Sequence, residues 1–223
     1  RVRKMITVKV NGEERQYPQG ATYEDVANDY QKEYDNLIAL AARDGKIREL
    51  FKKLTRDCEI TFFTLKDNVG NKTYVRSATM LFLKAVFDVY GREAAQNCRV
   101  EFAVGNGSYI SPRGQIASTA DNAAKIQDRM RELVAAKTPF LKRSYALDNA
   151  MELFHTEGMK DKEKLFRYRR GSFVNIYEMD GYYDYYYGYM LPNAGYVKWF
   201  DVIAYDEGFM LLLPDKQDPT NVT

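Results

Sequence analysis

Side chains that can act as nucleophiles, bases or metal ligands are scarce in this 223-residue chain. It contains one histidine, His155, and two cysteines, Cys58 and Cys98. The cysteines are far apart and lack a CxxC spacing, which excludes a disulfide framework and a cysteine-rich metal site. His155 stands near the end of an expected helix, where the helix dipole favours a cation, so we interpret it as structural.

Tyrosine is the most unusual component of the sequence. The chain has 18 tyrosines, and seven of them lie between Tyr177 and Tyr189. An extended segment over residues 182–189 would carry aromatic rings on both faces, which is typical of a platform on which bases stack. The alternative is an ordinary strand, because tyrosine has a high β-propensity and is often half-buried.

Basic side chains are concentrated in residues 160–170. The segment holds six cations against two acids: Lys160, Lys162, Lys164, Arg167, Arg169 and Arg170 against Asp161 and Glu163. Such a run can contact phosphates, or it can be a solvated charged loop. The net charge of the whole chain is only +2, so a global polyanion-binding surface is not implied.

The composition is that of a folded protein, with 45% hydrophobic and 29% charged residues. No apolar run approaches the roughly 20 residues that a membrane-spanning helix needs, and no signal peptide is visible. We therefore expect a soluble, cytoplasmic protein without a membrane partner.

The first 66 residues read as a small α+β unit. Residues 5–10 and 13–17 alternate like strands around Asn11-Gly12, the strongest short hairpin signal. Thr22 is an N-cap candidate with Asp25 three residues on, and a helix to about residue 31 follows. Three more strands are expected, over residues 37–42, 46–50 and 59–65. This order predicts a ubiquitin-like β-grasp fold for residues 5–66.

A turn-rich break at residues 67–71 separates this unit from a second α+β domain, expected over residues 72–214. Apolar spacing predicts helices over residues 75–90 and 119–137, which should pack on an antiparallel sheet. The remaining segments are a shorter helix, a charged loop and several strands: 99–104, 107–111, 140–145, 147–154, 171–179, 182–189 and 196–213. Residues 215–223 read as a polar linker towards a missing C-terminal domain.

Residues 6–65 resemble a TGS domain, the small module of threonyl-tRNA synthetases, certain GTPases and stringent-response enzymes. The matching words are Val10-Asn11-Gly12-Glu13, Tyr17-Pro18-Gln19-Gly20-Ala21-Thr22, Ala41-Ala42-Arg43-Asp44-Gly45-Lys46-Ile47-Arg48-Glu49-Leu50 and Asp57-Cys58-Glu59-Ile60. The resemblance covers the whole of the expected first domain.

Residues 77–213 look like the second additional, or editing, domain of threonyl-tRNA synthetase. The corresponding words are Arg76-Ser77-Ala78-Thr79-Met80, Ala103-Val104-Gly105-Asn106-Gly107-Ser108-Tyr109, Lys125-Ile126-Gln127-Asp128-Arg129-Met130 and the run from Phe154 through Gly158 to Lys162. The order and spacing of these motifs carry the resemblance.

The resembled family lines its site with an HxxxH on the first helix and a CxxxH in a late loop. The HxxxH positions here are Arg76 and Met80, and the CxxxH positions are Tyr186 and Met190. Of the family's functional positions only a lysine, Lys162, remains. Without these ligands the chain cannot hold zinc or activate water in the family's way. We therefore expect no catalytic residue and no metal site.

A TGS domain followed by a degenerate editing domain resembles the front half of bacterial uridine-kinase-like nucleoside kinases. The resemblance implies a C-terminal kinase domain in the same polypeptide, which would be the phosphotransferase. No G-x-x-x-x-G-K-[ST] phosphate loop occurs in this chain. ATP and Mg²⁺ are therefore expected only for that absent domain, and no cofactor is expected here.

Three functions remain open. The leading one is a non-catalytic regulatory region that binds a nucleotide, an aminoacyl group or an RNA end in the degenerate cleft. The expected cleft residues are Arg76, Met80, Lys162, Tyr186, Tyr189 and Met190. The alternatives are a divergent aminoacyl-tRNA editing hydrolase and an oligomerisation module, in which the tyrosine-rich strand forms a homo-oligomer interface. The side chains at the four former ligand positions, Arg76, Met80, Tyr186 and Met190, could also fill the cleft, so that no cavity remains.

Overall fold

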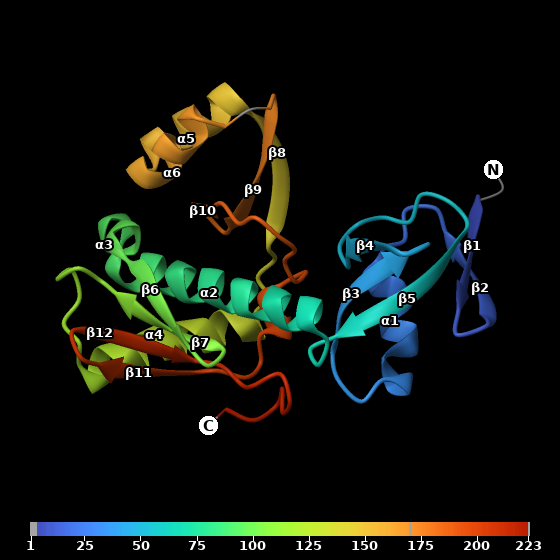
Figure 1. The fold of residues 1–223 in the computed structure, drawn as a ribbon, viewed down its shortest axis with the longest axis horizontal. Helices are drawn as coiled ribbons and strands as arrows, with labels where there is room; N and C mark the ends of the chain where they lie inside the picture. Colours follow the sequence, from blue (N-terminus) through green and yellow to red (C-terminus); the bar gives the residue numbers. More distant parts are fainter. Residues whose placement is uncertain (1–3, 170, 223) are drawn as a thin grey trace.

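The computed structural model describes residues 4–169 and 171–222. Within them the chain is an α+β protein with one mixed sheet, two antiparallel sheets and six α-helices (Figure 1). The N-terminal part (residues 4–66) and the C-terminal part (67–222) lie side by side, joined where β5 leads into α2 (Figure 1). The expected α+β class is confirmed.

The N-terminal part is one five-stranded mixed sheet with a helix. Its elements are β1 (Met5–Val10), β2 (Glu13–Pro18), α1 (Tyr23–Tyr30), the short 3-10 helix Gln31–Glu33, β3 (Ile38–Arg43), β4 (Lys46–Glu49) and β5 (Cys58–Thr64). The strand order is β2-β1-β5-β3-β4, and β1 and β5 run parallel. All five strands fall where the sequence predicts them.

Local signals explain the start of this unit. Asn11 and Gly12 have φ values of 51° and 81°, as the tight hairpin between β1 and β2 requires. Thr22 caps α1: its side chain accepts a hydrogen bond from the Asp25 backbone N–H, and the Asp25 side chain accepts one from the Thr22 N–H. This reciprocal capping box confirms the predicted helix start.

The cap gives a direct test of that helix start. Thr22→Ala should lower the free energy of unfolding by about 1 kcal/mol, because one backbone N–H at the helix start loses its acceptor. Thr22→Ser keeps the hydroxyl and should stay near wild type. Urea denaturation measures both variants, and an equal loss in the two would show that the hydroxyl is not what matters.

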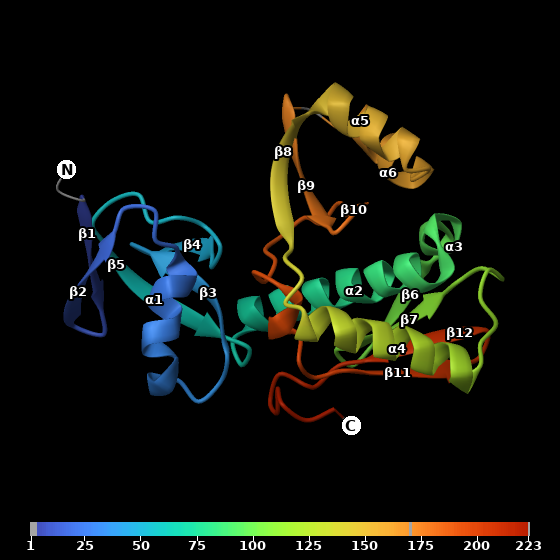
Figure 2. The same ribbon diagram turned by 180° about the vertical axis from the view of Figure 1, so that it is seen from behind.

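The C-terminal part contains two antiparallel sheets and five α-helices. Its elements are α2 (Asn68–Tyr90), α3 (Arg92–Asn97), β6 (Arg99–Val104), β7 (Gly107–Ser111), α4 (Ala120–Ala135), β8 (Leu141–Ala146), α5 (Leu147–Thr156), α6 (Lys160–Arg167), β9 (Phe173–Met179), β10 (Tyr182–Asp184), the 3-10 helix Ala194–Tyr196, β11 (Asp201–Tyr205) and β12 (Gly208–Leu212). Helices α2 and α4 pack together over the four-stranded sheet β11-β12-β7-β6 (Figure 2).

A second sheet stands over α2. It is three-stranded, in the order β10-β9-β8, and α5 and α6 cover it (Figure 2). Its small core is formed by Ala150, Phe154, Phe166, Val174 and Ile176. Among the described residues, no helix combines the length and apolarity needed to cross a membrane.

Three differences from the sequence expectation bear on the candidate site. Helix α2 begins at Asn68 rather than at residue 75, because Gly70 has no Cβ and lets the helix lie against the Thr64 carbonyl. The expected charged loop after residue 159 is the helix α6, whose Phe166 ring is buried 5.4 Å from the ring of Phe154. The basic run ends at Arg170, which is outside the described residues.

The third difference is the end of the tyrosine-rich strand. The run expected over residues 182–189 pairs only as far as Asp184. There the Asp184 carboxylate accepts hydrogen bonds from the Tyr182 hydroxyl and the Tyr185 backbone N–H, and the chain leaves the sheet. Tyr185 to Tyr189 therefore form an irregular segment, which ends at buried Met190.

The two parts meet through apolar and polar contacts. Ala39 and Leu40 of β3 belong to the same buried cluster as the inner face of α2, whereas the remaining core of the N-terminal part forms its own cluster. One buried carboxylate, Glu49 at the end of β4, reaches into the C-terminal part. The expected boundary between residues 66 and 72 stays a prediction.

Candidate ligand-binding site

A pocket of about 340 Å³ opens between β8, β9 and the irregular segment after β10. Five tyrosines, two cations, an asparagine and a glycine line it: Tyr177, Tyr185, Tyr186, Tyr187, Tyr189, Lys142, Arg169, Asn175 and Gly188. We call it the tyrosine pocket. Its walls combine large aromatic surfaces with positive charge, which is the composition of sites that hold a base beside a phosphate.

Strand register places the floor of the tyrosine pocket. Lys142 of β8 lies opposite Tyr177 of β9, so their side chains share one face of the small sheet. The ammonium of Lys142 lies 5.8 Å from the centre of the Tyr177 ring. Across the pocket, an Arg169 guanidinium N–H donates to the Tyr185 hydroxyl at 2.5 Å. The two cations therefore come from different elements and face one volume.

Arg76 of α2 holds the irregular segment, residues 185–189, in place. Its Nη1 donates a 2.6 Å hydrogen bond to the Tyr189 carbonyl oxygen. The guanidinium also packs on Gly188, where a Cβ atom would collide with it, and Gly188 has a φ of 139° that favours glycine. Burial lowers the pKa of Arg76, and Tyr177 and Glu49 oppose that effect. Arg76 thus positions the segment instead of facing a ligand.

The position of Gly188 leads to a testable prediction. Gly188→Ala should lower the free energy of unfolding by roughly 2–3 kcal/mol, from backbone strain together with displacement of the Arg76 guanidinium. Gly171→Ala is the matched control: its φ is 136°, and no atom lies within 4 Å of its added Cβ. Urea denaturation should show the larger loss for Gly188→Ala. Equal losses would mean that strain alone accounts for the effect and that Arg76 adds nothing.

Glu49 of β4 contacts Lys142 and Tyr177, the two residues that form the floor of the tyrosine pocket. Its side chain is 2% exposed, and it accepts three hydrogen bonds from the C-terminal part. Lys142 Nζ donates to Oε1 at 2.6 Å, and the Tyr177 hydroxyl and the Met190 backbone N–H donate to Oε2 at 2.8 and 2.9 Å. Burial, reinforced by the Glu49 carboxylate, raises the pKa of Tyr177 well above its usual range.

The structure places the six residues expected to wall a cleft in different surroundings, although Arg76 contacts Tyr189 directly. Tyr186 and Tyr189 line the tyrosine pocket, whereas Met80 and Met190 are fully buried in the large core. Lys162 lies outside the lining, with its Nζ 3.4 Å from the Asp184 carboxylate. Burial and Asp184 raise the pKa of Tyr186 well above its usual range, so its hydroxyl stays protonated.

The cations of the tyrosine pocket differ from those expected. Arg76 and Lys162 were the expected charges, and the lining instead contains Lys142 and Arg169. Arg169 belongs to the basic run that the sequence singles out, but Lys142 and Glu49 carry no local signal. Only the pairing of β8 with β9, and the docking of β4 beside them, brings them to the site.

The described lining of the tyrosine pocket has tyrosine, lysine, arginine and asparagine side chains but no histidine, cysteine or carboxylic acid. The single histidine, His155, is exposed and lies 3.2 Å from Glu163 on α6. Across residues 4–169 and 171–222, no group of three His, Cys, Asp or Glu side chains is arranged to hold a metal ion.

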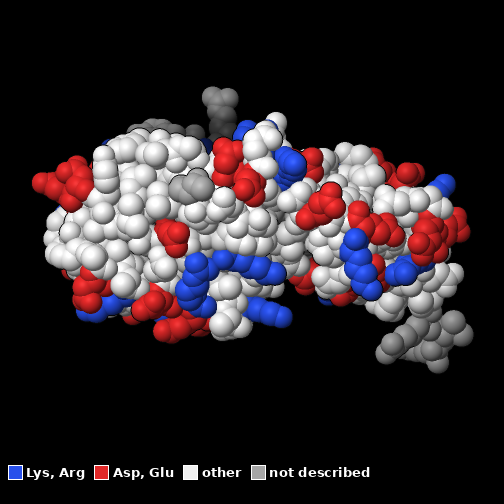
Figure 3. All heavy atoms as spheres, turned by 90° about the horizontal axis from the view of Figure 1, so that it is seen from below, with Lys and Arg blue, Asp and Glu red and all other residues white. Residues whose placement is uncertain are grey.

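One face of the molecule carries charges of both signs. On the face seen from below, Lys and Arg side chains gather in a group near the middle of the molecule, with acidic side chains to both sides (Figure 3). This mixture on one face agrees with the net charge of +2.

Comparison with known proteins finds weak similarity to threonine–tRNA ligases. The chain is 25% identical to the enzyme of Porphyromonas gingivalis over 84% of its own length, 27% identical to that of Thermotoga maritima over 89%, and 28% identical to that of Rhizobium etli over 84%. It spans only 29%, 30% and 28% of the lengths of these proteins. No protein-family model matches the chain. The chain is thus similar, over most of its length, to one region of the threonine–tRNA ligases.

Proposed function

We propose that this chain is a tRNA-related, editing-type region that binds the single-stranded end of an RNA, or a nucleotide, without chemical turnover. The observation that carries the proposal is the tyrosine pocket, in which five tyrosines and two cations surround about 340 Å³. Aromatic rings stack on bases irrespective of sequence, and Lys and Arg attract the phosphate between them. The volume lies in the range of small-ligand sites.

Two observations support this assignment. The chain resembles one region of threonine–tRNA ligases over 84% to 89% of its length, and the names of those proteins give tRNA as their substrate. The N-terminal sheet has the order β2-β1-β5-β3-β4 with α1 packed on it, which is the arrangement expected of a β-grasp. We therefore propose a TGS-type N-terminal domain followed by an editing-type domain that has kept binding and lost the family's ligand residues.

Binding should depend on the cation and the exposed ring of the tyrosine pocket. Fluorescence anisotropy with a labelled single-stranded RNA trinucleotide measures it. Tyr187, which is 88% exposed, should contribute a stacking contact, so Tyr187→Ala should weaken binding by about 1–3 kcal/mol. Tyr168→Ala is the matched control, because Tyr168 is 83% exposed and lies outside the lining.

The cation is tested in the same assay. Arg169→Gln should raise Kd about tenfold, because a charge-assisted contact to phosphate is lost. Arg143→Gln removes a neighbouring charge from β8, outside the lining of the pocket, and should leave Kd unchanged. Equal effects of Arg169→Gln and Arg143→Gln, or of Tyr187→Ala and Tyr168→Ala, would place the binding outside the tyrosine pocket.

A divergent aminoacyl-tRNA hydrolase is the alternative that the similarity to threonine–tRNA ligases also supports. The described lining offers no histidine, cysteine or carboxylic acid to activate water, and Lys142 is paired with Glu49, so the substrate would have to assist its own hydrolysis. Incubation with mischarged tRNA at high protein concentration should release no amino acid above the rate without protein. Release that disappears in Lys162→Ala would replace the binding proposal with the hydrolase.

Attachment to a uridine-kinase-like domain, which would use ATP and Mg²⁺, is a further proposal that rests on the sequence resemblance alone. The coding sequence beyond residue 223 tests it: a G-x-x-x-x-G-K-[ST] motif supports the attachment. Homo-oligomer formation is tested by light scattering on the purified chain, and a strictly monomeric mass would exclude an oligomerisation role.

A further inference from the structure

We infer that Glu49, a residue of the N-terminal part, lowers the affinity of the tyrosine pocket for doubly charged ligands relative to singly charged ones. The inference rests on the proposed function and adds the ligand's chemistry to it. Its physical basis is that the pocket is composite: β8 and β9 supply the floor, and β4 of the N-terminal part supplies the counter-charge beneath it.

The contacts of Glu49 assign separate roles to its two oxygens. Oε1 faces only the Lys142 ammonium, at 2.6 Å, and this is the ion pair. Oε2 accepts from the Tyr177 hydroxyl and the Met190 backbone N–H, and these two bonds hold the floor and the irregular segment in place. Charge compensation and positioning therefore act through different atoms of one carboxylate.

The local charge follows from simple addition. Lys142 and Arg169 contribute two positive charges to the lining, and Glu49, 2% exposed and in contact with Lys142, contributes one negative charge directly behind it. Arg76, which packs on Gly188 and interacts electrostatically with Glu49, adds a third positive charge beside the lining, so the sum is +2. Glu49 repels each negative charge of a ligand, so a doubly charged ligand loses more affinity through Glu49 than a singly charged one. A second ligand charge also meets a Lys142 that is already bound by its own carboxylate.

The repulsion from Glu49 weakens the binding of a terminal phosphate more than that of a phosphodiester. A phosphodiester carries one negative charge, and a terminal monophosphate carries about −1.5 to −2 at neutral pH. With tyrosines on both sides of the cations, the preferred ligand is a base–phosphodiester–base unit, as at the end of an RNA strand. A free nucleoside monophosphate should bind less well than its size and rings would suggest.

Glu49→Gln isolates the charge from the positioning. The amide carbonyl can still accept the two hydrogen bonds made by Oε2, while the amide NH₂ replaces the oxygen that held Lys142. The sum of these charges is then +3. We expect the affinity for adenosine 5′-monophosphate, relative to the dinucleoside monophosphate ApA, to rise about five- to tenfold.

Calorimetric titration of adenosine, ApA and adenosine 5′-monophosphate measures the effect in wild type, Glu49→Gln and Glu178→Gln. Glu178 is the matched control: it follows Tyr177 on β9, lies opposite Leu141 instead of Lys142, and is outside the lining. Its variant should keep the wild-type order, with ApA bound most tightly. Thermal unfolding verifies that each variant is folded. If Glu49→Gln is not, Lys142→Gln takes its place: it removes a positive charge of the lining and should lower the relative affinity for the monophosphate.

The outcomes separate the two proposals. A rise in relative monophosphate affinity in Glu49→Gln but not in Glu178→Gln supports the inference. Binding with an unchanged order in Glu49→Gln overturns the inference and leaves the proposed function standing. The absence of binding of all three ligands to the wild-type chain, together with the absence of RNA binding, overturns the proposed function and the inference with it.

Discussion

Glu49→Ala is expected to lower the free energy of unfolding of this chain by about 3–5 kcal/mol. The substitution leaves three groups of the C-terminal part without their acceptor: the Lys142 ammonium, the Tyr177 hydroxyl and the Met190 backbone N–H. Loss of a buried partner costs each of them its desolvation, because water cannot reach a site that is 2% exposed.

Urea denaturation followed by tyrosine fluorescence and by circular dichroism measures this loss. The control is Glu14→Ala, which removes the same group from an exposed position of β2 and should change stability by less than about 0.5 kcal/mol. Because Glu49 joins the two parts, its loss should also separate their transitions, so that two unfolding steps replace one. A single transition with an unchanged midpoint would contradict the structural role of Glu49.

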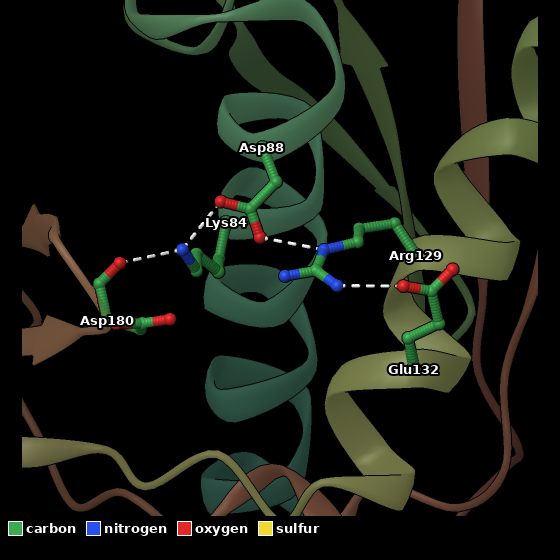
Figure 4. A network of polar contacts seen from close by, with 5 residues as sticks. All are labelled: Lys84, Asp88, Arg129, Glu132 and Asp180. Atoms are coloured by element: carbon green, nitrogen blue, oxygen red, sulfur yellow. Dashed lines mark hydrogen bonds and ion pairs between the residues drawn. The ribbon is translucent and has the colours of Figure 1, made fainter.

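Asp88→Ala is expected to cost about 3–4 kcal/mol, the second largest effect. Lys84 on α2 is a buried charge, with its side chain 2% exposed, and its ammonium lies 2.6 Å from the Asp88 carboxylate (Figure 4). It also donates to the Asp180 carbonyl at the turn between β9 and β10. The second Asp88 oxygen accepts from Arg129 on α4 at 2.9 Å. Removal of Asp88 leaves the buried Lys84 ammonium without its counter-charge, at the point where α2, α4 and the β9–β10 turn meet.

Lys84→Met is the informative companion variant. It removes the buried charge together with the need for a partner, and Asp88 still keeps Arg129, so the loss should be well below that of Asp88→Ala. Thermal unfolding of both variants gives the comparison. Equal losses would show that the ion pair itself, and not the burial of an unpaired charge, determines the effect.

The parts of the fold that could be predicted from sequence depend on short-range rules. Asn11-Gly12 fixes the first hairpin, Thr22 and Asp25 fix the start of α1, and the strands β6 and β7 lie at the predicted residues. Each signal acts within a few residues, so the distant chain does not alter it.

The two missed features have different causes. Helix α6 buries Phe166 against Phe154, and a run of lysines and arginines gives no sign of that partner. β10 stops at Asp184, where the carboxylate accepts local hydrogen bonds from the Tyr182 hydroxyl and the Tyr185 backbone N–H. The first contact is tertiary and the second is local, and composition and periodicity encode neither.

The sequence singles out some of the residues that line the tyrosine pocket, but not all of them. The tyrosines and Arg169 stand out in the sequence, and Tyr186 and Tyr189 do line the pocket. Lys142 and Glu49 are 93 residues apart in the chain and 2.6 Å apart in space, so no spacing rule could pair them. Met80 and Met190 match the resembled family's site positions but have become core.

The central claim is that the tyrosine pocket binds an RNA end, and the most direct test is NMR of ring-labelled tyrosines during titration with a single-stranded RNA trinucleotide. The account predicts that the resonances of Tyr185, Tyr187 and Tyr189 shift together and saturate with one Kd. The resonance of Tyr74, which is 2% exposed and outside the lining of the tyrosine pocket, should not shift. No shift at any of the three rings at millimolar RNA, or saturable shifts at Tyr168 alone, would contradict the claim.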